Sequence, residues 1–256
     1  MTALFGELWE SMRSFLERIG ALARFFGRLL WLTPGGLLKV RLLIEQVYNA
    51  GALSLVIIMT CGLFVGMVMG LQGYDLLQRI GSEDSLGVGA AMALLRELGP
   101  VVTALLFAGR AGTALASEIG LMRATDQLSA MEIMAVDPMR RVVLPRFLGG
   151  VIAMPLLTAV FIAISLYGVQ LIGVQFFGVD QGQFWSQMRG TVELSDIREG
   201  LIKGLAFGVA CSLIAVFEGY NSLPTAEGVG QATTRTVVVS AVVTLILDYI
   251  ITALLL

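Results

Sequence analysis

The feature that most constrains this chain is the length of its stretches without a charged residue. One runs from Gln46 to Tyr74 and another from Phe147 to Val179. A helix needs about 20 predominantly apolar residues to cross the hydrocarbon core of a bilayer, and both stretches exceed that length. A strand of a membrane barrel would instead alternate apolar and polar residues over about ten positions. These stretches therefore predict membrane-spanning helices.

The composition also indicates that much of the chain is surrounded by lipid. Of the 256 residues, 57% are hydrophobic and 14% are charged, and the mean hydropathy is +0.85. Soluble domains carry about 25% charged residues, so this surface is too apolar for water and requires a bilayer. The formal net charge of −2 gives no support for a nucleic-acid partner. We predict an all-α integral membrane protein.

The residue types exclude several kinds of catalysis. The chain has no histidine, which removes Ser-His and Cys-His nucleophiles and histidine metal sites. Cys61 and Cys211 both lie in apolar stretches, where a free cysteine acts as a small hydrophobe. The only lysines, Lys39 and Lys203, lie outside any phosphate-binding G-x-x-x-x-G-K-[ST] loop. We therefore predict no enzyme activity, no catalytic residue, no metal site and no cofactor in this chain.

Apolar stretches and the charges between them predict five spans. Their expected limits are about 48–74, 86–109, 147–172, 200–218 and 236–256, within a transmembrane domain at 37–256 that follows an interfacial helix and elbow at 1–36. Eleven Lys and Arg residues flank one side of these spans and three flank the other. Because basic residues favour the cytoplasmic side, the N-terminus and the 110–146 segment are predicted to be cytoplasmic. An odd number of spans places the C-terminus on the opposite side.

The N-terminal segment predicts an amphipathic helix over residues 3–31. Apolar residues recur every three or four positions and charges occupy the other faces, as in a helix that lies in the membrane interface. A short coiled coil is the alternative interpretation. The run Thr33-Pro34-Gly35-Gly36 is expected to end this helix.

A second amphipathic helix is predicted over residues 121–135, between the second and third spans. Its apolar stripe consists of Leu121, Ala124, Leu128, Met131 and Ala135, and its polar residues are Arg123, Asp126, Gln127 and Glu132. Asp137 and Pro138 then provide the cap and first residue of the next helix. This segment is either a lever that docks into a cytoplasmic partner or a connector that is solvated or lies at the membrane surface.

Two features within the spans suggest more than a hydrophobic anchor. Gly62, Gly66 and Gly70 form a small-residue ridge with a spacing of four, which either lets another helix approach closely or merely fills a membrane helix. Arg96 and Glu97 interrupt the second span near its middle. Charges at such depth face protein or a wet cavity, so they either line a site for the headgroup of a substrate or form structural ion pairs with other helices. Lys203 and Asp248 admit the same two interpretations.

Several motifs resemble those of the MlaE (YrbE) permease family. They are LRELGPVVTALL at 95–106, AGRAG at 108–112, ASEIG at 116–120, MRATDQL at 122–128, AVDP at 135–138, GMVMGLQGY at 66–74 and ATTRTVV at 232–238. The likeness extends over about residues 40–256, and the N-terminal helix is similar in character more than in residues.

The resemblance implies the membrane permease subunit of an ABC transporter. Such a transporter moves phospholipid between the bacterial inner membrane and periplasmic carriers and maintains the lipid asymmetry of the Gram-negative outer membrane. Two copies are expected to enclose a lipid cavity. The implied partners are the ATPase MlaF, which holds ATP and Mg, the STAS-domain protein MlaB, the hexameric MCE protein MlaD and, through MlaD, the carrier MlaC.

The resemblance also implies roles for particular residues. The 121–135 helix with Asp137 would couple to the ATPase. The cavity would be lined by Met69, Gln72, Tyr74, Leu77 and Ile80 at the end of the first span and by the polar residues Arg96, Glu97 and Arg235. The competing function classes are an ion-coupled secondary transporter, with the buried charges as a relay, and a passive membrane scaffold.

Overall fold

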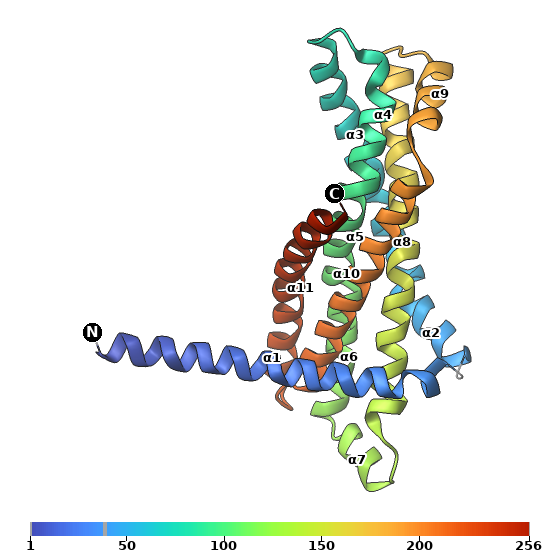
Figure 1. The fold of residues 1–256 in the computed structure, drawn as a ribbon. Coiled ribbons are helices and arrows are strands. Elements are labelled where there is room, and N and C mark those ends of the chain that lie inside the picture. The colour runs from blue at the N-terminus through green and yellow to red at the C-terminus, as the bar shows by residue number, and fades with distance from the viewer. Residues whose placement is uncertain (1, 38–39, 256) are drawn as a thin grey trace.

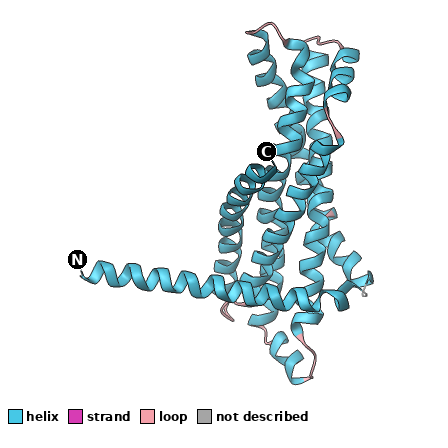
Figure 2. Cartoon of the chain, viewed as in Figure 1, coloured by secondary structure: helices cyan, strands magenta, loops and turns pink. Residues whose placement is uncertain are grey.

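The computed structural model describes residues 2–37 and 40–255, and in these ranges the chain is helical with short connections and no strand (Figure 2). Five helical stretches are long and apolar enough to cross a membrane, which confirms the predicted all-α membrane fold. They are Val40–Gln78, Glu83–Ala124, Met139–Phe176, Leu194–Tyr220 and Ala226–Leu255.

Three of these stretches consist of several shorter helices joined end to end. The first contains α2 (Val40–Ala50), η1 (Ala52–Ser54) and α3 (Leu55–Gln78), and the second contains η2 (Glu83–Ser85), α4 (Leu86–Ala93), η3 (Leu94–Leu98), α5 (Gly99–Phe107), η4 (Ala108–Gly112) and α6 (Thr113–Ala124). The third contains η5 (Met139–Val143), α8 (Leu144–Gln170) and η6 (Leu171–Phe176), while α10 (Leu194–Tyr220) and α11 (Ala226–Leu255) are continuous.

The remaining helices lie outside the five stretches. α1 (Thr2–Leu37) runs across the lower part of the bundle, crosswise to the spans (Figure 1). α7 (Gln127–Ile133) lies below α1, and α9 (Gln181–Thr191) lies at the opposite end of the molecule (Figure 1). Residues 180–199, a polar stretch outside the predicted spans, thus contain α9 and the first turns of α10.

Two predicted features at the α1 end of the bundle are wrong. The run Thr33–Gly36 does not end the first helix, because α1 continues to Leu37; its buried Leu29 packs into the bundle, and this packing outweighs the local preference for a break. The 121–135 segment is not one helix either. It divides at Asp126, whose φ of 56° is left-handed, into the end of α6 and the separate helix α7.

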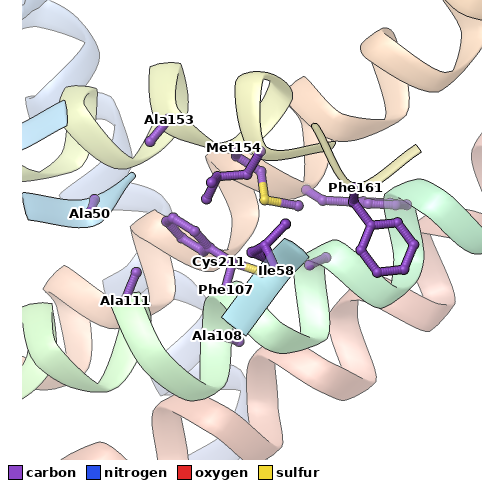
Figure 3. Close-up of a cluster of buried hydrophobic side chains, with 12 residues drawn as sticks. Ala50, Ile58, Phe107, Ala108, Ala111, Ala153, Met154, Phe161 and Cys211 are labelled. Carbon is purple, nitrogen blue, oxygen red and sulfur yellow. The ribbon is translucent and has the colours of Figure 1, made fainter. Parts of the chain in front are cut away.

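The centre of the bundle is a cluster of buried apolar side chains from α3, α5, α8 and α10 (Figure 3). Phe107, Met154 and Ile58 point toward one another in this cluster, and Cys211 lies beside them (Figure 3). Cys211 is a free, buried thiol, so it acts here as a small hydrophobe. This cluster fixes the positions of the helices that carry the charged site described below.

The glycine ridge of α3 faces α8 and its continuation η6. A Cβ atom on Gly62 would lie 3.2 Å from the Phe161 carbonyl oxygen, and one on Gly70 would lie 3.0 Å from Cβ of Ile172. At Gly66 it would overlap the backbone of Ser165. Only hydrogen at these positions lets the two backbones approach so closely.

A methyl group at Gly66 is therefore expected to force α3 and α8 apart. We predict that Gly66→Ala lowers the free energy of unfolding by about 1–3 kcal/mol, the usual range for overpacking, measured by thermal unfolding in detergent. Gly109→Ala is the matched control, because Gly109 is also helical and nothing lies within 4 Å of its added Cβ. Equal unfolding temperatures for the two variants would contradict the close approach.

Candidate functional site

The charged site forms around a local widening of the second span. Residues Leu94–Leu98 adopt a π-helical turn, η3, a distortion that often marks functional positions. Pro100 follows at the start of α5 and has no N–H to offer the carbonyl of Arg96, four residues earlier. The Lys203 Nζ of α10 donates to that carbonyl oxygen at 2.6 Å. A buried cation thus takes the place of a missing backbone donor.

Arg96 is bound to the start of α10. Its Nε and Nη2 donate to Oδ1 of Asp196 at 2.9 and 2.5 Å. The other carboxylate oxygen of Asp196 accepts from the backbone N–H of Glu193 at 2.9 Å and completes the capping box of α10. The Arg96–Asp196 pair therefore joins the π-helical turn to the N-terminus of the fourth span.

Lys203 is the centre of the site. Its side chain is fully buried, and Nζ lies 3.0 Å from Oε1 of Glu97 and 3.3 Å from Oδ1 of Asp248. Thr252 accepts from Nζ at 2.8 Å and donates to Glu97 at 3.3 Å. Because Asp248 and Thr252 belong to α11, one ammonium group connects the second, fourth and fifth spans.

The site holds more carboxylates than cations. Asp196, Glu199, Glu97 and Asp248 surround Arg96 and Lys203. The side chains of Arg96 and Glu97 nevertheless remain 41% and 42% exposed. The arrangement therefore joins three helices and leaves one edge, at Arg96 and Glu97, open. We refer to these six residues and Thr252 as the charged junction.

The structure brings Arg96, Glu97, Lys203 and Asp248 together, but Arg96 and Glu97 pair with different partners and not with each other. The sequence analysis missed Asp196, Glu199 and Thr252. Asp196 and Glu199 lie just before the predicted fourth span, whereas α10 begins earlier, at Leu194. Glu199 and Lys203 are spaced i,i+4, a pattern that could have extended the predicted helix.

The five residues predicted to line the mouth of a cavity separate into two groups. Met69, Tyr74 and Leu77 pack against a buried cluster of α4, α8 and α9, and the Tyr74 ring stacks on Phe177 with centroids 4.0 Å apart. Gln72 and Ile80 are exposed. In a single copy of the chain, only Gln72 and Ile80 therefore face outward.

Arg235 is not part of the charged junction. It is exposed on α11 and precedes Asp248 by about 13 residues, which is about 20 Å along a helix. Arg235 thus lies toward the end of α11 that is near α1 and α7 (Figure 1).

The short helix α7 carries the other candidate surface. Leu128 is buried, and Met131 packs partly buried against the same cluster as Leu29 and Ile119. At the tip, Ile133 and Met134 are 87% and 67% exposed. The sequence analysis missed both, because they lie off the stripe that contains Leu128 and Met131. Leu121, Asp126, Gln127 and Glu132 are also exposed.

Contacts on either side hold α7 in place. Arg123 donates to the backbone carbonyl of Tyr220, and its guanidinium lies 6.0 Å from the centre of the Tyr220 ring. Asp137 accepts from the backbone N–H of Met139 at 3.0 Å and pairs with Arg28 of α1 at 3.4 Å. The loop around α7 is thereby connected to α10 and to the transverse helix.

These features define a class: a five-span helical membrane protein with a polar junction among its spans and an exposed helical tip outside them. Comparison with known proteins gives the family. The family model for permease MlaE matches residues 43–254, and the chain belongs to the MlaE permease family.

Individual relatives agree with this assignment. The chain is 58% identical over 213 residues, 83% of its length and 82% of the relative, to a Haemophilus influenzae protein described as intermembrane phospholipid transport system permease protein MlaE. It is 35% identical over 218 residues, 85% of its length and 84% of the relative, to a probable ABC transporter permease protein of Rickettsia typhi. A probable ABC transporter permease protein of Synechocystis is 31% identical over 231 residues, 90% of the chain and 88% of the relative.

Proposed function

We propose that this chain is the membrane permease subunit of an ABC transporter that moves phospholipid between the bacterial inner membrane and periplasmic lipid carriers. The observation that carries the proposal is the 58% identity to a permease described as part of an intermembrane phospholipid transport system. At this identity over most of both chains, the five spans and the charged junction are expected to serve the same substrate class.

The tip of α7 supports an ATPase partner. Ile133 and Met134 are large apolar side chains exposed outside the bundle, on the same side as the transverse helix α1 (Figure 1). Such exposed pairs beside polar residues are typical of docking surfaces, and Asp126, Gln127 and Glu132 provide that polar surround. Because Arg123 and Asp137 tie the α7 loop to α10 and α1, movement of a bound ATPase would pass directly to the spans.

The face of α11 supports a homodimer with a central lipid cavity. Val238, Val242, Leu245 and Tyr249 are spaced along one side of α11 and are all more than half exposed. A span with so little burial faces either lipid or another protein surface. A second copy placed against this side would enclose the open edge of the charged junction, at Glu97, between two subunits.

The charges on the two sides support the orientation. Arg24, Arg28 and Arg41 flank the α1 side of the bundle, with Arg140 and Arg141 in the α7 loop. Basic residues in short loops favour the cytoplasm. These charges support a cytoplasmic location for the N-terminus, α1 and α7, with the C-terminus toward the periplasm.

In the proposed cycle, the affinity of the cavity for phospholipid must change. Acyl chains enter the apolar cavity while the headgroup stays near the charged junction. ATP binding to the partner moves α7, and the spans then close the cavity. Closure must disfavour bound lipid by several kcal/mol, because a ligand shifts an equilibrium only through differential affinity.

The proposal is tested by purifying the chain with its partner proteins in nanodiscs. We expect an ATPase to co-purify, and its hydrolysis to be vanadate-sensitive and stimulated by lipid. An ion-coupled secondary transporter would show transport without an ATPase, and a passive scaffold would show no lipid-stimulated hydrolysis.

Charge reversal at Glu97 tests the role of the charged junction in transport. Glu97→Lys would bring a second ammonium group to Lys203 Nζ, now 3.0 Å from Glu97, and the open edge allows it to turn outward. We expect the complex to assemble and lipid transfer between labelled vesicles to fall at least about tenfold. The matched control is Asp75→Lys, the same reversal of charge at an exposed acid outside the junction. Full transfer by Glu97→Lys would exclude a headgroup role.

A further inference from the structure

A second apolar feature lies on the outside of the bundle, between α8 and α10. These helices pack side by side (Figure 1), but their outer faces leave a groove of about 740 Å³. Its walls include Pro155, Leu156, Leu201 and Leu205, and its only charged residue is Arg198. A smaller groove of about 330 Å³ adjoins it at Leu156 and continues toward α2.

Arg198 differs from the arginine of the charged junction. Arg96 is held by Asp196, whereas Arg198 is exposed and has no ion-pair partner among the described residues. A guanidinium group binds phosphate oxygens through paired N–H donors. The groove therefore combines an apolar trough with one cation free to bind an anion at its end.

The position of the groove follows from placing α1, as its sequence predicts, along one membrane interface. Phe25 of α1 packs on Phe217 of α10 with ring centroids 5.5 Å apart, so Phe217 would lie at the level of that interface. Arg198 precedes Phe217 by about 19 residues, or about 29 Å along α10, close to the thickness of a hydrocarbon core of about 30 Å. Arg198 thus lies at the opposite interface, and Leu205 lies about 10 Å deeper.

We infer that this groove is a peripheral binding site for a phospholipid of the leaflet opposite α1. Arg198 binds the headgroup phosphate, and one acyl chain follows the trough past Leu201 and Leu205. The guanidinium of Arg198, at the level of the membrane interface, favours a phospholipid as the ligand. An apolar partner helix in the groove would leave this guanidinium without a counter-charge. This site goes beyond the central cavity proposed above, because it needs only the membrane position of α1, α8 and α10 and no second copy of the chain.

The test is photo-crosslinking of the full chain in nanodiscs that contain phosphatidylglycerol with a diazirine on its acyl chain. We expect labelled peptides within 155–159 and 194–205. Arg198→Ala should lower that labelling about fivefold, since one basic residue at the surface contributes about 1 kcal/mol toward an anionic lipid. Arg79→Ala is the matched control, because Arg79 is an exposed arginine outside the groove, and should leave the labelling unchanged.

Two results would overturn the inference. One is equal labelling of the groove in Arg198→Ala and the unaltered chain, which would show only bulk lipid in contact. The other is loss of groove labelling in the assembled complex together with a protein cross-link from a photoreactive residue at Leu201, which would show a partner helix in the groove. Neither result depends on transport activity, so failure of this inference is distinguishable from failure of the proposed function.

Discussion

Lys203→Met is expected to lower the free energy of unfolding by about 3–5 kcal/mol, the range for removing one partner of a buried ion pair. The change leaves Glu97 and Asp248 without the ammonium group that lies 3.0 and 3.3 Å from them. It also removes the donor to the Arg96 carbonyl. The measurement is thermal unfolding in detergent, followed by circular dichroism, with Arg79→Ala as a control at an exposed pair.

A triple variant separates the two causes of this loss. Adding Glu97→Gln and Asp248→Asn to Lys203→Met removes the uncompensated carboxylates and should recover part of the lost stability. The remainder would reflect the other lost contacts of Nζ, its bonds to the Arg96 carbonyl and to Thr252. Because the residues share one network, their effects are not expected to add. A loss below about 1 kcal/mol for Lys203→Met would contradict the view that the charged junction holds three spans together.

The sequence predicted the helices because their dominant signal is local. Uncharged stretches longer than about 20 residues leave few alternatives to a spanning helix, and all five spans are present. Their ends were less predictable. The second span continues from Glu83 to Ala124, past Arg110 and Arg123, because both arginines find acceptors in the protein: Arg110 donates to the Asn49 carbonyl and Arg123 to the Tyr220 carbonyl.

The charged junction could be predicted only in part. Arg96, Glu97, Lys203 and Asp248 are conspicuous, because charge within an apolar stretch is costly. Which charge meets which partner depends on helix packing between residues about a hundred positions apart, as for Arg96 and Asp196. The substitution of Lys203 Nζ for the donor that Pro100 lacks is a tertiary contact that no local pattern indicates.

In the 121–135 segment the apolar residues have helical spacing, yet the segment is not one continuous helix. Leu121, Leu128 and Met131 fit one stripe in the sequence. In the structure Leu121 belongs to α6 and is exposed, whereas Leu128 belongs to α7 and is buried. The left-handed turn at Asp126 reorients the chain between them. As a result, the most exposed apolar side chains of this loop are Ile133 and Met134, which lie off the predicted stripe.

This surface gives the prediction with the largest effect on assembly. Replacing both Ile133 and Met134 with Ser is expected to weaken ATPase binding by about a hundredfold or more, because each buried apolar side chain contributes about 1.5–3 kcal/mol. The measurement is the amount of ATPase that co-purifies with the chain, together with lipid-stimulated hydrolysis. The fold should be unaffected, since both side chains are exposed.

Ile80→Ser is the matched control, since Ile80 is an equally apolar residue, 69% exposed, at the end of the bundle away from α7. It should retain the ATPase. The comparison also separates coupling from assembly: the Glu97→Lys complex keeps its ATPase and loses lipid transfer, whereas the α7 variant loses both. If the ATPase binds the α7 variant as tightly as the unaltered chain, the nucleotide-driven movement must enter the spans elsewhere, and α7 is then only a connector between the second and third spans.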